Sequence, residues 1–403
     1  MTHRQKPNST VVAIAFLALA AVPLRVWGEV AVQCPGDTDG DGVPDVAVPP
    51  NVKCMHLGAG DGFITMADGR PMYMFGFSNL TGVPPLGAME AGMLAANFPA
   101  PTIEIKEGDE FYLSLTNVGM MVRPDLFDPH TVHFHGFPHA SAAFDGVPDA
   151  SISINMGFTL AYYYNIVEPG TFMYHCHVEA TEHMQMGMLG NLYVHPAQDG
   201  TSYEFPPGSG RSYTRFVYND GDGTTGFDRE FPIQIGSFDP AFHDASWTVQ
   251  VLPFAAMRDR YPMLNGRGYP DTVNPAPLPA PAENGNKVSQ RVSSLVEATH
   301  GEKVLLRISN LNVTNFYTLT ALGLPMKVVG RGARQLRGAG QGAGQNVHFD
   351  VTTVTLGGGE SVDVIIDTSA VPPGRYFLYA TNLNYLSNDV EDFGGMMTEI
   401  VIN

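Results

Sequence analysis

The chain has few basic residues, few cysteines and no hydrophobic run long enough to cross a membrane. Its 403 residues include 22 lysines and arginines against 40 aspartates and glutamates, and the formal net charge is −18. Such an acidic surface disfavours nucleic acid and favours cationic partners, including metal ions. The apolar run from Val11 to Val22 follows Arg4 and Lys6 and is too short for a comfortable membrane span. We therefore predict a secretory signal peptide over residues 1–28 and a secreted or periplasmic protein.

Only three cysteines are present. Cys34 and Cys54 bracket a Gly/Asp-rich segment, and in an exported protein we expect them to pair. Cys176 is then the odd thiol. Its neighbours are His175 and His177, which favour a metal ligand over a structural thiol.

Charged residues are also scarce, at 15%, whereas the chain has 44 glycines and 31 prolines. Low charge, frequent turns and β-branched runs predict an all-β protein. A hydrophobic fraction of 44% is enough for two domains with separate cores. A Pro-rich stretch is expected to form an extended surface loop at 269–286. The predicted segments are an Asp/Gly-rich N-terminal segment at 29–55, a first domain at 56–198 and a second domain at 210–403.

Acidic residues alternate along the N-terminal segment. Asp37, Asp39, Asp41 and Asp45 surround two glycines, a pattern that suits a hard cation with oxygen ligands such as Ca²⁺. The glutamate that closes a full EF-hand loop is missing, and Val48 stands in its place. The segment is therefore either a calcium loop or a solvated acidic turn.

The first domain contains a copper-ligand pattern at residues 170–188. His175-Cys176-His177 is followed by His183 and Met188, and blue-copper sites use two histidines, one cysteine and a weak axial methionine. The preceding run is strand-like, and neighbouring side chains on a strand point to opposite faces. We therefore expect Cys176 to face one way and the two flanking histidines the other.

A second histidine motif, His130-Thr-Val-His133-Phe-His135-Gly136, lies upstream, and both motifs recur without ligands in the second half. "EGDEFYLSLTN" at 107–117 matches "HGEKVLLRISN" at 300–310. In this match, His130, His133 and His135 of the first copy correspond to Asn315, Thr318 and Thr320 of the second copy. His175, Cys176 and His177 correspond to Tyr379, Ala380 and Thr381. The fold is thus expected twice, and the metal chemistry once.

These motifs, together with "PAPTIEIKEGD" at 99–109, resemble those of the multicopper oxidases over roughly residues 56–403. The resemblance implies two cupredoxin-like Greek-key β-sandwich or barrel domains. It also implies a copper-dependent oxidoreductase with dioxygen as electron acceptor. The implied copper ligands are His130, Cys176, His183 and axial Met188 for type 1, His133 for type 2, and His135, His175 and His177 for type 3. Cys176, His133 and His135 are the implied catalytic residues.

Two departures from the family pattern stand out. Five residues separate His177 from His183 where the family usually has three, so we expect a bulge or an altered loop there. A trinuclear cluster needs eight histidines, and the first domain offers four. The second domain has only His243, His300 and His348, none of them in a His-x-His pair.

Three interpretations follow from the missing histidines. Two first domains facing each other across a two-fold axis would supply four histidines each, and we expect a homo-oligomer. A reduced site would resemble that of copper nitrite reductases, although His133 replaces their catalytic aspartate. Last, the protein would carry electrons or store copper without being an enzyme. The sequence does not choose among phenols, metal ions and redox proteins as the reductant.

Overall fold

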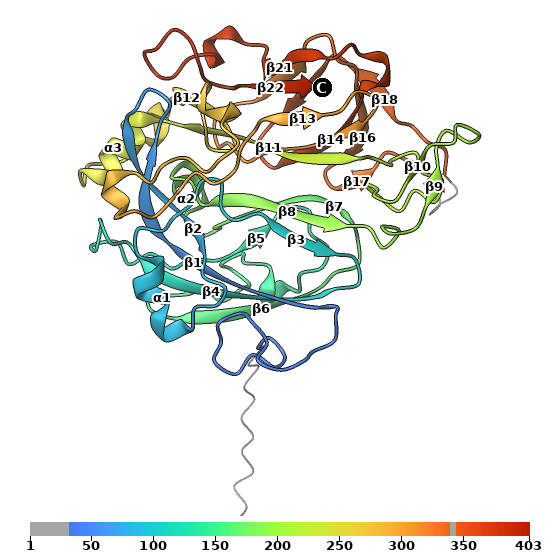
Figure 1. Ribbon diagram of the computed structural model, residues 1–403. Coiled ribbons are helices and arrows are strands. Elements are labelled where there is room, and N and C mark those ends of the chain that lie inside the picture. The colour runs from blue at the N-terminus through green and yellow to red at the C-terminus, as the bar shows by residue number, and fades with distance from the viewer. Residues whose placement is uncertain (1–31, 339–343) are drawn as a thin grey trace, which may run out of the picture. The chain divides into compact units, whose positions relative to one another are not determined.

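The computed structural model describes residues 32–338 and 344–403, and it confirms the all-β prediction (Figure 1). The signal peptide predicted at 1–28 lies outside the described residues. Residues from Val32 to Asn403 form one compact unit that contains two β-sandwiches in sequence order. The limits of the two predicted domains stay predictions.

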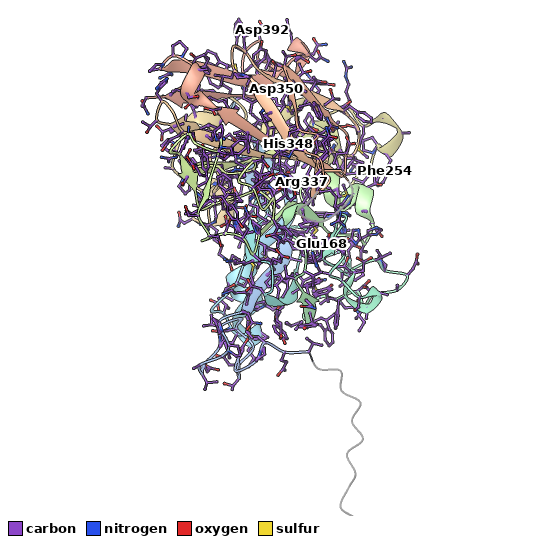
Figure 2. The ribbon with its side chains drawn as sticks, turned by 90° about the vertical axis from the view of Figure 1, so that its right-hand side faces the viewer. Glu168, Phe254, Arg337, His348, Asp350 and Asp392 are labelled. Atoms are coloured by element: carbon purple, nitrogen blue, oxygen red, sulfur yellow. A yellow bond between two sulfur atoms is a disulfide. The ribbon has the colours of Figure 1, made fainter. Side chains whose placement is uncertain are left out.

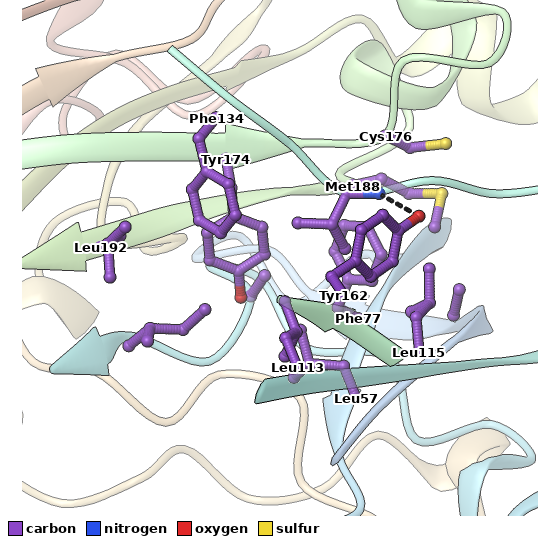
Figure 3. Packing of buried hydrophobic residues seen from close by; sticks show 14 of the residues in the cluster. Leu57, Phe77, Leu113, Leu115, Phe134, Tyr162, Tyr174, Cys176, Met188 and Leu192 are labelled. Atoms are coloured by element: carbon purple, nitrogen blue, oxygen red, sulfur yellow. Dashed lines mark hydrogen bonds between the residues drawn. The ribbon is translucent and has the colours of Figure 1, made fainter. Parts of the chain in front are cut away.

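The first sandwich has two four-stranded sheets. The outer sheet has the order β2-β1-β4-β6, and the inner sheet the order β3-β8-β7-β5. These strands are β1 (Val52–Thr65), β2 (Pro71–Asn79), β3 (Ile103–Lys106), β4 (Glu110–Gly119), β5 (His133–Phe134), β6 (Thr159–Asn165), β7 (Gly170–His175) and β8 (Leu189–His195). Buried side chains from both sheets, such as Leu113 and Leu192, form one core between them because residues of one strand face alternate sides (Figure 3).

The second sandwich repeats this topology. Its sheet orders, β12-β11-β14-β20 and β13-β22-β21-β15, match those of the first sandwich strand for strand and carry additional edge strands. The strands are β11 (Arg229–Phe238), β12 (Tyr261–Leu264), β13 (Val296–Ala298), β14 (Lys303–Asn310), β15 (Tyr317–Ala321), β16 (Met326–Arg331), β17 (Arg334–Gln335), β18 (Phe349–Val351), β19 (Thr353–Leu356), β20 (Glu360–Asp367), β21 (Gly374–Ala380) and β22 (Met397–Ile402). Its core is a separate cluster of buried residues.

Helices are short and lie between strands. They are α1 (Pro85–Gly92), α2 (Ala180–Gln185) and α3 (Pro240–Trp247), with single 3₁₀ turns η1 (Ala142–Phe144), η2 (Phe254–Ala256), η3 (Asp271–Val273), η4 (Ala282–Asn284), η5 (Thr368–Ala370) and η6 (Leu383–Tyr385). A small hairpin, β9 (Tyr203–Glu204) with β10 (Ser212–Tyr213), occupies the Gly/Pro/Ser-rich connection.

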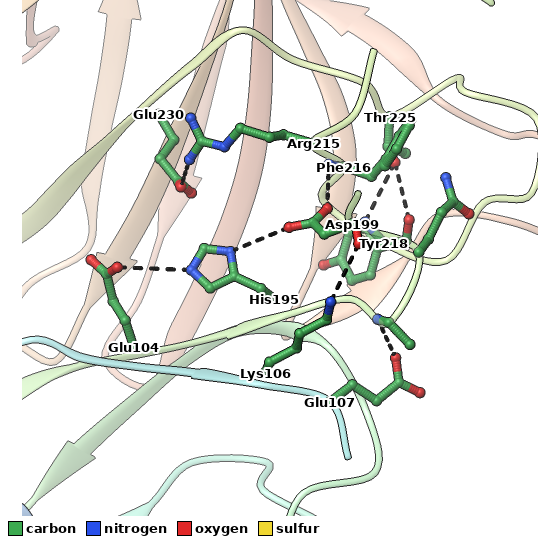
Figure 4. Close-up of polar contacts among 12 residues, drawn as sticks. Glu104, Lys106, Glu107, His195, Asp199, Arg215, Phe216, Tyr218, Thr225 and Glu230 are labelled. Carbon is green, nitrogen blue, oxygen red and sulfur yellow. Dashed lines mark hydrogen bonds and ion pairs between the residues drawn. The ribbon is translucent and has the colours of Figure 1, made fainter. Parts of the chain in front are cut away.

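A polar network joins the two sandwiches. The fully buried guanidinium of Arg307 donates to Glu230 at 2.8 Å and to Thr171 at 3.0 Å, and it lies 3.8 Å from Asp363. Asp363 also accepts hydrogen bonds from Thr171 and from Tyr218. Figure 4 shows Glu230 with Arg215 next to the group formed by Glu104, His195 and Asp199. Arg307 and Asp363 of the second sandwich are thus both hydrogen-bonded to Thr171 of the first.

Two features outside the sandwiches were predicted from the sequence, a disulfide and a surface loop, and only the disulfide is as expected. The expected disulfide between Cys34 and Cys54 is present, with a Cα–Cα distance of 5.9 Å. The Pro-rich stretch at 269–286 is mostly exposed, but it is not simply a surface loop. Its Asn284 is buried and exchanges two hydrogen bonds with the backbone of Phe63 on β1. This stretch therefore fastens the second sandwich to the first.

Candidate metal centre

The end of strand β7 places Cys176 in the core of the first sandwich. β7 pairs with β8, and just beyond its last residue the Cys176 N–H donates to the carbonyl of Met188 at 3.2 Å. Cys176 and Met188 are both fully buried, and Figure 3 shows them together at one end of the hydrophobic cluster. The adjacent backbone bridge between His130 and Ile154 fixes the third segment of the site.

Three of the predicted type 1 ligands converge on one point. The Nδ1 atom of His183 lies 3.2 Å from the sulfur of Cys176, and the Nδ1 atom of His130 lies 3.6 Å from it. All three side chains are buried, and their ligand atoms lie within 4.8 Å of one another. Two imidazoles and one thiol are the donor set of a blue-copper site.

Burial is the largest effect that holds these donors in their uncharged forms. It raises the pKa of the Cys176 thiol to about 12 and lowers the pKa of His183 to about 4. The pKa of His130 falls well below its usual value for the same reason. A thiol needs a cation nearby to ionise in such surroundings. The pocket therefore fits a metal ion, which would compensate the thiolate charge while binding two neutral imidazoles.

The longer spacer before His183 forms a helix. Glu179 adopts a left-handed conformation, with φ 44°, and α2 then carries His183 on its fourth residue. The return to Met188 is made by Gly187, at φ 114° and packed against Phe75 and Phe98. The altered loop expected from the spacing is thus one short helix, and it turns His183 back towards Cys176.

A second cluster lies on the other side of the same chain segment. His133, His135 and His175 bring their ligand atoms within 4.8 Å of one another, and β5 pairs His133 directly with His175. The ring of His177 stacks beside that of His175 at 5.6 Å and lies 4.9 Å from that of His133. As expected from the strand, Cys176 and its two flanking histidines serve different clusters.

Backbone carbonyls orient the imidazoles of this second cluster. Nδ1 of His133 lies 2.6 Å from the carbonyl of Asp145, and Nδ1 of His175 lies 2.7 Å from the carbonyl of Cys176. Each Nδ1 therefore carries the proton, which leaves the lone pair on Nε2. Metal-binding histidines commonly have this arrangement, in which one ring nitrogen donates to a carbonyl and the other binds the metal. The Nε2 lone pairs of these two rings thus fit a cation.

The third imidazole is oriented from the second sandwich. Gly359, in the Gly-rich turn between β19 and β20, lies against the ring of His135. The Gly359 N–H donates to the carbonyl of Asn310, which fixes the turn in this position. A Cβ at this glycine would lie 2.8 Å from Nδ1 of His135, and its φ is +87°. The close approach therefore requires glycine.

An acidic group surrounds the outer side of His183. Asp128, Glu179 and His183 bring ligand atoms within 4.8 Å of one another. Burial and the neighbouring carboxylates Glu179 and Asp128 raise the pKa of Glu182 to about 7. Burial and Glu179 also raise the pKa of Asp128. Negative charge is thus concentrated next to the predicted type 1 site.

The second sandwich keeps the frame of the site without its ligands. The Ala380 N–H donates to Met396 at 3.0 Å, as the Cys176 N–H does to Met188. The strand register, however, differs from the sequence match. Thr320 stands opposite Tyr379 where His133 stands opposite His175, so Thr320 takes the place that we had assigned to Thr318.

The predicted calcium loop is closed by its own hydrogen bonds. Asp37 accepts from the backbone N–H groups of Gly40, Asp41 and Gly42, and Asp45 accepts from Thr38. Asp37, Asp39 and Asp41 lie close enough to share an ion, but Asp45 is not in this group. The turn is thus stable by itself, and calcium stays a prediction.

The remaining histidines have other partners. His195 lies between Glu104 and Asp199, as Figure 4 shows, and His348 lies close to Arg337 and Asp350 in the second half (Figure 2). Sequence reasoning missed Asp128 and Gly359. Asp128 stands two residues before His130, and that proximity was an available signal. Nothing in the sequence connects Gly359 with His135.

Comparison with known proteins gives a consistent result. Family models described as multicopper oxidase match residues 81–199 and 260–403. Laccase-15 of Oryza sativa subsp. japonica is 26% identical over 70% of this chain, and Laccase-5 of Arabidopsis thaliana is 23% identical over 76% of it. The chain spans only 39% and 43% of these two relatives. In the described part of the chain, no helix has the length and apolar character that a membrane span requires.

Solved structures with the same fold include three copper proteins. The multicopper oxidase mgLAC and the blue copper oxidase from Nitrosomonas europaea each align with a TM-score of 0.61 at 21% identity, over 86% of this chain and 85% of theirs. A copper nitrite reductase from Nitrosomonas europaea aligns with a TM-score of 0.54 at 16% identity, over 86% of this chain and 93% of its own. At these identities the likeness concerns the cupredoxin-like fold.

Proposed function

Because this chain belongs to the multicopper oxidase family, we propose that it oxidises a reductant at the site of His130, Cys176 and His183 and delivers the electrons to its four-histidine cluster, where dioxygen is reduced. The observation that carries the proposal is the adjacency of two metal-ligand clusters along one chain segment. Copper bound in both would supply one-electron redox chemistry.

The residues of the first cluster would hold a type 1 copper. His130, His183 and Cys176 would be its three strong ligands, and Met188 would be a weaker fourth one. Their complete burial excludes water, which favours outer-sphere electron transfer over ligand exchange. Phe75 packs edge-on against the His183 ring at 5.8 Å and helps to fix its orientation.

The second cluster would hold type 2 and type 3 copper through His133, His135, His175 and His177. The chain itself connects the two clusters, since Cys176 is bonded covalently to both His175 and His177. The hydrogen bond from His175 Nδ1 to the Cys176 carbonyl adds a second connection of 2.7 Å. These bonds offer electrons a short route from one cluster to the other.

Four histidines are half of the eight that a trinuclear cluster needs. We propose that a second copy supplies the other half across a two-fold axis. The partial exposure of His133, at 18% of its side chain, supports this arrangement because it leaves one side of the cluster open. Gly359 of the same chain covers the side next to His135. A second copy would therefore approach from the His133 side.

The test combines copper counting, spectra and gas consumption. The copper-loaded wild type should show the intense visible band of thiolate-to-copper charge transfer, and it should consume dioxygen with a phenolic or metal-ion reductant. Cys176→Ser should lose the band and the oxygen consumption while keeping the copper of the second cluster. A blue protein that consumes no dioxygen would be an electron carrier, and one that consumes nitrite a reductase; either result would refute the proposal.

A further inference from the structure

Helix α2 is too short to hold His183 in place by itself. It has 6 residues, and an isolated helix of that length is not stable in water. Its last residue, Gln185, is only 2% exposed, and both its side chain and its carbonyl have partners outside the helix. Because His183 lies two residues before Gln185, whatever fixes Gln185 also fixes the imidazole next to Cys176.

The partners of Gln185 come from the connection between β11 and β12 in the second half of the chain. This connection covers residues 239–260 and contains α3, which lies beside β2 (Figure 1). The equivalent connection in the first sandwich, between β1 and β2, is a short turn at 66–70. The extra length of the second copy packs on the first sandwich, where Leu252 and Met257 contact the core that contains Cys176.

Asp259, near the end of this connection, receives the side chain of Gln185. Nε2 of Gln185 donates to Oδ1 of Asp259 at 2.7 Å. Oδ2 of Asp259 accepts from the hydroxyl groups of Ser237 on β11, at 2.5 Å, and of Thr314, at 2.6 Å. The carboxylate is thus held by the second sandwich and in turn holds the end of α2.

His243 on α3 fills the space between α2 and β2. Its ring is fully buried, with Nδ1 2.6 Å from the carbonyl of Tyr73 and Nε2 3.0 Å from the carbonyl of Gln185. Burial lowers the pKa of His243 to about 4, so at neutral pH the ring is uncharged and donates its single N–H to one of these carbonyls. A rigid ring between two backbone segments sets the distance between them.

One capping residue fixes Asp259 and His243 relative to each other. Asp239 is buried at the start of α3, and its Oδ1 accepts from the Ala241 N–H at 2.9 Å. Its Oδ2 accepts from the N–H of Arg258, the neighbour of Asp259, at 2.8 Å. The two ends of the connection are therefore tied together, and its two contacts with α2 belong to one structural unit.

We propose that Asp259 and His243 are positioning residues for the type 1 site. They hold α2 through Gln185 from two sides, so the second sandwich, whose matched positions lack metal ligands, determines where His183 lies. The inference rests on the proposed function, because it names residues that support that same site. Residues that orient a ligand histidine usually affect metal affinity strongly, even when they lie outside the ligand set.

A double-mutant cycle tests the contact between Gln185 and Asp259. Gln185→Met and Asp259→Ala should each weaken binding of the type 1 copper about tenfold or more, as measured by chelator competition at the blue band. Both remove the same hydrogen bond, so the double variant should lose no more than the larger single loss. The position of the blue band and the copper hyperfine splitting in EPR should also shift.

Ser361→Ala is the matched control. Its buried hydroxyl also joins the two sandwiches, by donating to the Thr171 carbonyl at 2.8 Å, but Thr171 lies at the start of β7 and Cys176 follows the end of that strand. This variant should keep the copper affinity and the spectra of the wild type. Equal losses in Ser361→Ala would mean that any loosening of the junction disturbs the copper, and would overturn the inference.

His243 gives an independent test, which also serves if Asp259→Ala does not fold. His243→Leu should shift the same spectra and weaken copper binding, whereas His243→Gln, which keeps an N–H donor, should largely restore both. Wild-type spectra and affinity in His243→Leu and Gln185→Met would refute the inference and leave the oxidase proposal intact. Additive losses in the double variant would also contradict it. A copper-loaded wild type without the blue band would refute the oxidase proposal itself.

Discussion

Nε2 of His135 lies 2.9 Å from Nε2 of His175 in the four-histidine cluster. Nδ1 of His175 donates to the Cys176 carbonyl, so Nε2 of His175 has a free lone pair and accepts this hydrogen bond from His135. A cation held by both rings would take the place of that proton. The geometry of this pair therefore depends on what holds the two rings, and the ring of His135 lies against Gly359 of the second sandwich.

Gly359→Ala should damage the histidine cluster selectively. The new methyl group would lie 2.8 Å from Nδ1 of His135, so the ring must move away from its place in the cluster. We expect the blue band to persist, while copper per chain and oxygen consumption both fall. Copper quantitation with EPR of the non-blue signal measures the effect.

Gly301→Ala is a matched control for Gly359→Ala. Gly301 has a similar φ of +95° in the same sandwich, but nothing lies within 4 Å of its added Cβ. Both variants place an alanine in the left-handed backbone conformation, and this strain destabilises each of them by about 1–3 kcal/mol. Equal copper content in the two variants would show that Gly359 has no positioning role.

Arg307→Met should destabilise the junction between the sandwiches strongly. The substitution leaves the buried carboxylate of Asp363 without its guanidinium, whereas the partly exposed Glu230 keeps Arg215. Breaking a buried ion pair typically costs about 3–5 kcal/mol. Urea unfolding of the copper-loaded protein gives the free energy. Lys327→Met, which removes an exposed pair with Asp350, should cost about 1 kcal/mol or less. Similar losses in the two variants would contradict the structural role of the network.

Stability should fall as the pH drops from about 6.5 to about 4 because of His139. Burial, and then the charge of Arg334, lower the pKa of His139 in the folded state to about 4. Its Nδ1 accepts a hydrogen bond of 3.0 Å from the Val167 N–H, which a protonated Nδ1 cannot do. The unfolded chain binds a proton near pH 6.5, so protons favour unfolding across this window and the contribution is complete only above it.

His139→Gln should flatten the pH dependence of the unfolding free energy between these limits, because glutamine does not titrate. His300→Gln, at an exposed position, should keep the wild-type slope. Denaturant titrations at several pH values measure both. An unchanged slope in His139→Gln would mean that other groups cause the loss of stability in acid.

The sequence alone was sufficient for the chemistry of the ligands. Cys176 between two histidines indicates copper because few other patterns combine a free thiol with adjacent imidazoles, and strand alternation separates the thiol from its neighbours without any knowledge of the fold. The pairing of Cys34 with Cys54 followed from their places on either side of a Gly/Asp-rich segment in a protein predicted to be exported. The repeat was visible in matched sequence motifs, and the two sandwiches share one strand order.

Only the tertiary structure decided how these residues meet. The spacer before His183 is a helix because the chain must return within a few residues to the start of β8, and spacing alone does not distinguish a helix from a bulge. The register that puts Thr320 opposite Tyr379 depends on pairing between strands about 60 residues apart in the chain. Contacts such as Gly359 with His135, and Asp128 with His183, arise from packing across long sequence separations, which local patterns do not encode.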